Sequence, residues 1–108
     1  MLNAPAIGAA EASARRGRPG VVFLDVREPA EHAVARIEGA TLIPMREIPG
    51  RAGELDPEGE IVVFCHHGSR SAMVVDWLRR NGFSRAINLA GGIDAWSCEV
   101  DPSVPRYR

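Results

Sequence analysis

Residues 61–71 read Ile-Val-Val-Phe-Cys-His-His-Gly-Ser-Arg-Ser, and this segment sets the architecture predicted for the whole chain. Its first four residues, Ile61 to Phe64, are a short apolar run rich in β-branched side chains, which is typical of a parallel strand buried on both faces. From Ser71 the apolar residues follow a helical period up to Arg80, and Gly82 is a C-terminal stop. The residues between are therefore predicted to form a turn that joins the end of a buried strand to the start of a helix.

This turn has the features of a reactive loop. Successive backbone N–H groups, together with the positive end of the helix dipole, form a concavity that stabilises an anion, so a cysteine placed there ionises readily. Gly68 lets the backbone approach a ligand closely, and Arg70 adds a planar fork of donors suited to an oxyanion. We expect Cys65 to be the nucleophile and the rest of the active loop to be His66, His67, Gly68, Ser69, Arg70 and Ser71.

The pattern Cys-x-x-Gly-x-Arg-Ser at 65–71 resembles the active loop of the rhodanese-like sulfurtransferases. Three further stretches resemble motifs of that family in the right order. Residues 23–32 resemble its Leu-Asp-Val-Arg-x-x-x-Glu motif, residues 37–44 its Gly-Ala-x-x-Ile-Pro segment, and residues 88–96 its closing Gly-Gly-x-x-Ala-Trp motif. Together they span 21–96, which is far more specific than one short match.

The spacing within the loop separates two chemistries. Cysteine phosphatases and arsenate-reducing proteins use Cys-x5-Arg, whereas Cys65 and Arg70 are separated by four residues. The shorter loop suits one transferable sulfur better than a bound phosphate. Phe64 also occupies a position where many such phosphatases carry a histidine.

The remaining chain alternates predicted strands and helices, which indicates an α/β domain with a parallel sheet. The resemblance implies a single rhodanese-like domain over 1–108, with a central, mostly parallel five-stranded sheet flanked by helices on both faces. Within it we expect a helical segment at 1–20, a core at 21–97 and an extended tail at 98–108. The predicted strands are 21–25, 41–43, 61–64 and 86–89. The predicted helices begin at Pro29, Glu47, Ser71 and Ile93.

Asp25 and Arg27 stand at the carboxyl end of the strand predicted at 21–25, and in the family this Asp-x-Arg stretch lies near the active loop. The interpretation we favour is a structural ion pair, with Glu28 or Glu31 as a possible partner of Arg27, because buried charges are usually paired. A supporting role in the site is the alternative.

His66 and His67 occupy positions that, in the family, line the mouth of the active-site pocket. If partly protonated, they would help to hold an anionic donor. We expect no metal, because adjacent residues rarely chelate one ion. Cys98 has no comparable setting and is interpreted as a spare thiol, although a resolving role for a persulfide stays open.

Composition excludes several classes of function. At 108 residues with 45% hydrophobic content the chain suits one globular domain, and a net charge of −1 gives no drive toward nucleic acid or anionic membranes. No apolar stretch approaches a membrane span, and no signal peptide is evident at the N-terminus. We therefore expect no nucleic-acid or membrane partner and a cytoplasmic location, where the two cysteines would stay reduced.

This chain departs from the family pattern before Ile37, where it has Ala35-Arg36 and the family commonly has Gly-His. The family's histidine at that position is usually structural. The tail at 100–107 resembles the ends of small bacterial rhodanese-like proteins and of modules fused to adenylyltransferase domains, which hints at a sulfur-relay partner.

The resemblance implies a sulfurtransferase that moves a sulfane sulfur from a small anionic donor such as thiosulfate, through a persulfide on Cys65, to a thiol or a sulfur-carrier protein. It implies no metal and no organic cofactor. Two alternatives remain: a docking or regulatory module without turnover, and, less favoured, a phosphatase or arsenate reductase.

Overall fold

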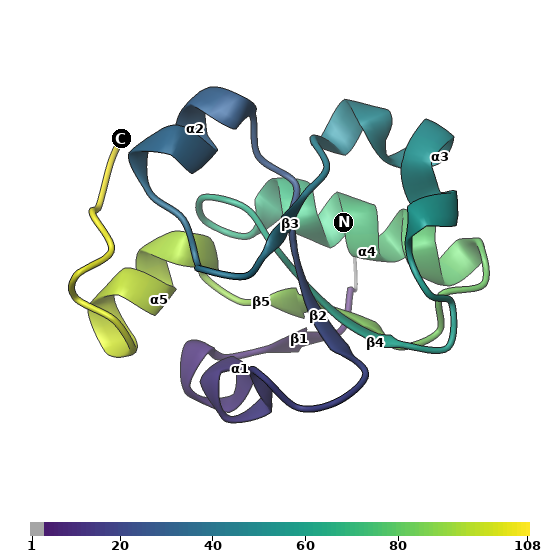
Figure 1. The fold of residues 1–108 in the computed structure, drawn as a ribbon, viewed down its shortest axis with the longest axis horizontal. Coiled ribbons are helices and arrows are strands. Elements are labelled where there is room, and N and C mark those ends of the chain that lie inside the picture. Colours follow the sequence, from purple (N-terminus) through teal and green to yellow (C-terminus); the bar gives the residue numbers. More distant parts are fainter. Residues whose placement is uncertain (1–3) are drawn as a thin grey trace.

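The computed structural model describes residues 4–108 as an α/β domain built on one five-stranded sheet (Figure 1). All strand pairs are parallel and the order is β1-β5-β4-β2-β3. The strands are β1 Ala6–Ile7, β2 Val21–Asp25, β3 Thr41–Leu42, β4 Glu60–Phe64 and β5 Ala86–Leu89. The strand that leads to Cys65 is therefore the central one, paired on both sides.

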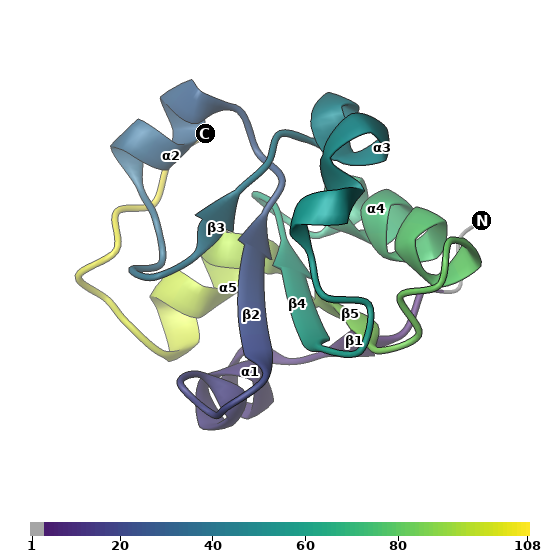
Figure 2. The ribbon, with the colours of Figure 1, turned by 45° about the vertical axis from the view of Figure 1, so that its right-hand side comes forward.

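Helices cover both faces of the sheet, as Figure 2 shows. The α-helices are α1 Ala9–Arg15, α2 Pro29–Val34, α3 Ile48–Arg51, α4 Ser69–Arg80 and α5 Gly92–Glu99. Two short 3-10 turns, η1 Met45–Glu47 and η2 Ala52–Glu54, flank α3. None of the helices within residues 4–108 is long and apolar enough to cross a membrane.

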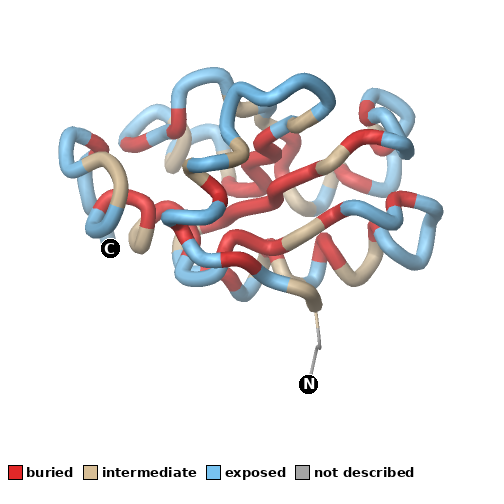
Figure 3. The backbone as a smooth tube through the Cα atoms, turned by 90° about the horizontal axis from the view of Figure 1, so that it is seen from below, coloured by how far each residue is buried: buried red, intermediate tan, exposed pale blue. Residues whose placement is uncertain are grey.

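The period-two alternation of the strands divides the core into two clusters. On the face covered by α3 and α4, Leu24, Ile61 and Val63 of the strands share a cluster with Leu78 of α4 and with Phe83. On the face covered by α1 and α5, Phe23, Val62 and Phe64 share a cluster with Ile93 and Trp96 of α5. Figure 3 shows these buried segments running through the middle of the molecule. Burial on both faces explains why β4 reads as a continuous apolar run.

The predicted architecture is confirmed, and the differences are one missed strand and several displaced element ends. The first strand, β1, was missed, because the sequence analysis placed only a helix in the segment 1–20. Helix α4 begins at Ser69, two residues before the predicted start. Helix α5 continues to Glu99, inside the stretch expected to be an extended tail. Residues 1–3 of the predicted N-terminal helical segment lie outside the described residues.

Candidate active site

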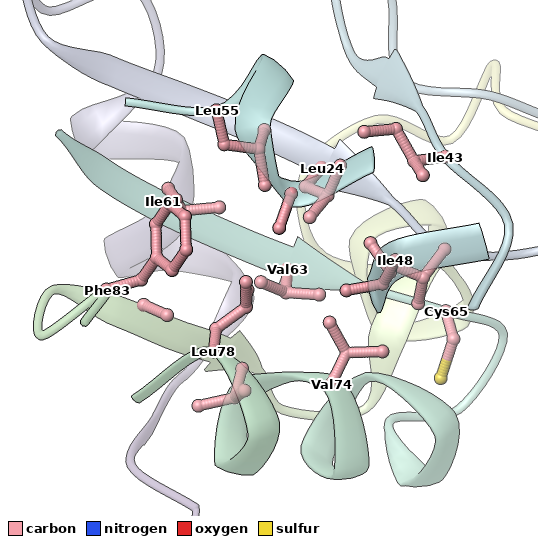
Figure 4. Close-up of a cluster of buried hydrophobic side chains, with 14 residues drawn as sticks. Leu24, Ile43, Ile48, Leu55, Ile61, Val63, Cys65, Val74, Leu78 and Phe83 are labelled. Carbon is pink, nitrogen blue, oxygen red and sulfur yellow. The ribbon is translucent and has the colours of Figure 1, made fainter. Parts of the chain in front are cut away.

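Cys65 lies directly after β4, at the carboxyl edge of the sheet where the active loop was predicted. The residue is 1% exposed, and its side chain packs at the end of the cluster that contains Val63 and Val74. Figure 4 shows the sulfur turned away from that cluster, toward the first turn of α4. The fold thus holds the thiol at the boundary between an apolar core and a polar loop.

Three hydrogen-bond donors converge on the sulfur. The backbone N–H of Gly68 lies 3.1 Å from Sγ, the backbone N–H of Ser71 lies 3.4 Å from it, and the Ser71 hydroxyl lies 3.2 Å from it. Gly68 has φ of 112°, a conformation that glycine alone adopts easily, and in this turn its N–H points at the sulfur. These donors and the start of α4 favour negative charge on the sulfur. Of the two loop serines, Ser71 supplies its hydroxyl to the sulfur, whereas Ser69 is exposed.

Asn88 on β5 completes this arrangement. Its Oδ1 accepts a hydrogen bond of 2.6 Å from the Ser71 hydroxyl, and its Nδ2 donates to the Gly68 carbonyl at 3.1 Å. Because a hydroxyl has one proton, Ser71 can donate to Asn88 or to Sγ but not to both at once. An ionised sulfur, which only accepts, would draw that proton toward itself. Asn88 was not predicted as a site residue, and the one signal for it in the sequence is a polar residue within the otherwise apolar run at 86–89.

A second helix start fixes the other side of the loop. The first N–H groups of α5, from Ile93 and Asp94, donate to the carbonyl oxygens of Cys65 and His66 at 2.9 and 3.1 Å. Gly92 has φ of 61°, and a Cβ added there would lie 2.5 Å from both carbonyl oxygens. Close backbone contact with the active loop thus explains Gly92 of the closing motif, whereas Gly91 has φ of 77° and a Cβ there would lie 2.6 Å from the Ala95 side chain.

Arg70 pairs with Glu31 of α2. Its two terminal nitrogens contact the two carboxylate oxygens at 2.7 and 2.8 Å, in a bidentate geometry. This pairing, reinforced by hydrogen bonds from the Glu28 backbone and Tyr107, lowers the pKa of Glu31 to about 2. The donor fork expected to face an oxyanion is therefore occupied by a carboxylate, and Arg70 ties the loop to α2. In the sequence, Glu31 is the glutamate of the Leu-Asp-Val-Arg-x-x-x-Glu motif and a possible partner of Arg27, and its pairing with Arg70 was not predicted.

Asp25 and Arg27 form a fully buried ion pair at 2.7 Å. The remaining Arg27 donors reach the backbone carbonyls of Glu31 and Ala35 and the Tyr107 hydroxyl. His32 also contacts the Asp25 carboxylate, at 3.0 Å. The partner of Arg27 is therefore Asp25, rather than the Glu28 or Glu31 carboxylate, and the geometry favours the structural interpretation of this pair.

His66 and His67 stack face to face, with ring centroids 3.9 Å apart, and Tyr107 of the C-terminal tail stacks on the other side of His66. Burial, followed by the neighbouring His67, lowers the pKa of His66 below its usual value. The suggestion that a protonated His66 attracts an anionic donor is therefore not supported. Among residues 4–108, no group of three or more histidine, cysteine or acidic side chains is placed to hold a metal ion.

Comparison with known proteins agrees with this fold. Residues 8–99 match the family model of the rhodanese-like domain. A sulfurtransferase of Allochromatium vinosum is 39% identical over 71% of this chain and 72% of its own. A rhodanese-like/PpiC domain-containing protein of Arabidopsis thaliana is 41% identical over 79% of this chain but only 30% of its own. A crystal structure of a rhodanese-related protein from Thermoplasma volcanium, 31% identical, superposes with a TM-score of 0.83 over 95% of this chain and 99% of that one.

The chain belongs to the rhodanese-like domain family. Other relatives are a putative sulfur carrier protein of Bacillus subtilis and a probable adenylyltransferase/sulfurtransferase of Mycobacterium tuberculosis, and the chain spans less than half the length of either. Sulfur transfer is thus supported at the level of the family.

Proposed function

We propose that this domain is a sulfurtransferase in which Cys65 carries a sulfane sulfur as a persulfide. The observation that carries the proposal is the convergence of the Gly68 and Ser71 donors on Sγ. Such donors stabilise the thiolate before the reaction. They would also donate hydrogen bonds to the terminal sulfur of a persulfide.

The first half-reaction transfers one sulfur atom. The Cys65 thiolate attacks the sulfane sulfur of thiosulfate or a similar anionic donor, a new S–S bond forms, and the S–S bond of the donor breaks with its electron pair leaving on sulfite. The negative charge then resides on the terminal sulfur of the persulfide.

In the second half-reaction, the thiolate of an acceptor attacks that terminal sulfur. The acceptor becomes the persulfide and Cys65 is released as a thiolate, so no electrons are gained or lost from outside. We expect no metal and no organic cofactor, because the sulfur itself supplies the reactive bond. The protein holds the loop: α4 presents its donors, α5 fixes the Cys65 and His66 carbonyls, and Glu31 anchors Arg70.

The acceptor we favour is a small thiol or a sulfur-carrier protein. Relatives named as a sulfur carrier and as adenylyltransferase/sulfurtransferases support a place in a sulfur relay. Cys65 must be a free thiol to act, and a reducing compartment would keep it so. The cytoplasmic location stays a prediction for this reason.

The test is the mass of the reduced protein after incubation with thiosulfate. We expect an increment of one sulfur that maps to Cys65, is removed by cyanide or a thiol, and is absent in Cys65→Ser. Cys98→Ser is the matched control, since Cys98 is exposed on α5, and it should take up sulfur like the parent.

If neither thiosulfate nor another sulfane donor adds sulfur to Cys65, the proposal is wrong. The domain would then be better explained as a docking module. Turnover of an aryl phosphate or of arsenate that depends on Cys65 would instead revive the oxyanion chemistry that the short loop disfavours.

A further inference from the structure

The C-terminal tail ends against the active loop. In Figures 1 and 2 the chain leaves α5 and runs back so that its end lies beside α2. Three contacts anchor the tail on the way: Val104 is buried, the Ser97 hydroxyl donates to the Val104 carbonyl at 2.6 Å, and Arg106 pairs with Asp94 at 2.9 Å. The anchored tail therefore holds Tyr107 beside the active loop.

Tyr107 contacts the loop through its ring. The ring lies parallel to that of His66, with an interplanar angle of 9° and centroids 3.9 Å apart. The Nε2 atom of His66 is buried without a hydrogen-bond partner, and it is the one such side-chain nitrogen or oxygen among residues 4–108. The His66 ring is therefore held by stacking against Tyr107 and against His67, and not by a hydrogen bond to this nitrogen.

The hydroxyl of Tyr107 contacts the other end of the loop indirectly. It accepts a hydrogen bond from Arg27 at 3.0 Å and donates one to Glu31 at 2.9 Å. Glu31 in turn holds both terminal nitrogens of Arg70. One side chain therefore touches the residue after Cys65 by its ring and orients, through its hydroxyl, the carboxylate that binds Arg70.

We propose that Tyr107 is a positioning residue of the active loop, which clamps the loop at His66 and at Arg70 so that the Gly68 and Ser71 donors stay aimed at Cys65. The reasoning deepens the proposed function and rests on it, because the clamp matters for sulfur transfer only if Cys65 is the carrier. Tyr107 touches neither the sulfur nor a reacting atom, so its effect on Cys65 is transmitted through the loop.

Two substitutions separate its contacts. Tyr107→Phe keeps the ring and removes both hydrogen bonds, whereas Tyr107→Leu removes the stack as well. Ser103→Ala is the matched control, since Ser103 lies in the same tail and its side chain bonds only to Asp101. All variants are made in the Cys98→Ser background, so that Cys65 is the one thiol that reacts.

The first readout is hydrogen exchange of the amides at 65–71 by mass spectrometry. Loss of a hydrogen bond or of a stacked pair should speed exchange of these amides by about three- to tenfold each, so Tyr107→Leu should exceed Tyr107→Phe. Amides of β4 serve as the internal reference and should not change, because the fold itself stays closed.

The second readout is the rate of Cys65 alkylation by iodoacetamide, measured over a range of pH. With the donors less well held, the rate at neutral pH should fall by about threefold in Tyr107→Leu and by less in Tyr107→Phe. Ser103→Ala should leave it unchanged.

A Tyr107→Leu protein that melts at a lower temperature but keeps the exchange of 65–71 and the alkylation profile of the parent would overturn the proposal, because the tyrosine would then serve packing alone. Neither readout requires sulfur transfer. A clamp that is confirmed in a protein that takes no sulfur from any donor would therefore reject the sulfurtransferase proposal and leave the positioning role of Tyr107 in place.

Discussion

The carboxyl ends of β2 and β4 are neighbours in the sheet, since Asp25 pairs in register with Phe64, yet they present opposite kinds of polar site. At the end of β2, Asp25 and Arg27 are fully buried, and each charge is matched by a partner charge or a carbonyl. After β4, three donors surround one sulfur, and no side-chain cation within residues 4–108 hydrogen-bonds to it. The first site is closed and stabilises the domain, whereas the second has donor capacity left for negative charge and can support chemistry.

Glu31 joins the two sites. Its backbone carbonyl accepts from Arg27, and its carboxylate binds Arg70 and the Tyr107 hydroxyl. The comparison therefore predicts that substitutions after β2 change stability, substitutions after β4 change reactivity, and Glu31 changes both.

The largest effect is expected for Arg27→Met. Removing one partner of a buried pair leaves the Asp25 carboxylate uncompensated, which should lower the free energy of unfolding by about 3–5 kcal/mol. Urea denaturation measures this loss. The double variant Asp25→Asn/Arg27→Met should be more stable than the single one, and equal stability of the two would contradict the ion-pair explanation.

Gly92→Ala should come next, at about 2–3 kcal/mol, because a left-handed residue with a Cβ is strained and the added atom would displace the Cys65 and His66 carbonyls. The alkylation rate of Cys65 should fall in the same variant, as the loop must shift. Gly53→Ala, where an added Cβ meets open space and φ is not positive, is the control. A folded Gly92→Ala protein with normal reactivity would show that α5 does not position the loop.

Ser71→Ala should reduce reactivity far more than stability. Loss of a hydrogen bond to a charged sulfur should slow persulfide formation by about ten- to hundredfold. The free energy of unfolding should fall by only about 1 kcal/mol, because the Asn88 oxygen is left without its donor. Mass-resolved time courses with thiosulfate measure the first and urea titration the second. Ser84→Ala, at an exposed serine, should match the parent, and an unaffected rate in Ser71→Ala would remove the hydroxyl from the mechanism.

The smallest effect, about 1 kcal/mol at neutral pH, is expected for Glu31→Gln. Because the pKa of folded Glu31 lies near 2, below its usual value, the stability from this carboxylate is fully present above about pH 4.5 and is lost as the pH falls toward 2. The stability curves of parent and variant should therefore differ at neutral pH and converge in acid. Curves that stay parallel down to pH 2 would show that the ionised carboxylate contributes nothing.

The sequence predicted what depends on local patterns. The apolar run of β4, the glycine that turns the loop and the helical period of α4 together placed Cys65 at a helix start, and they did so because each signal lies within a few residues. The strand β1 was missed because it has two residues and only one buried side chain, too short for a period to appear.

Other features depend on contacts between distant segments. Asn88 lies beside Ser71 only because β5 neighbours β4, and Glu31 meets Arg70 only after α2 has packed against the loop. The tail was expected to be extended, but nothing local in Pro-Arg-Tyr indicates that the tyrosine reaches His66. Such pairings follow from topology and cannot be read from spacing along the chain.

The position of β1 at the edge of the sheet has a consequence for synthesis on the ribosome. β1 is synthesised before the other strands of the sheet but pairs only with β5, so its ladder hydrogen bonds cannot form until nearly the whole domain has emerged. At about 5–20 residues per second, the segment waits several seconds without its partner. The earliest strand of the sheet can thus pair only when the latest one, β5, is available, whereas β2, β3 and β4 can pair as they are made.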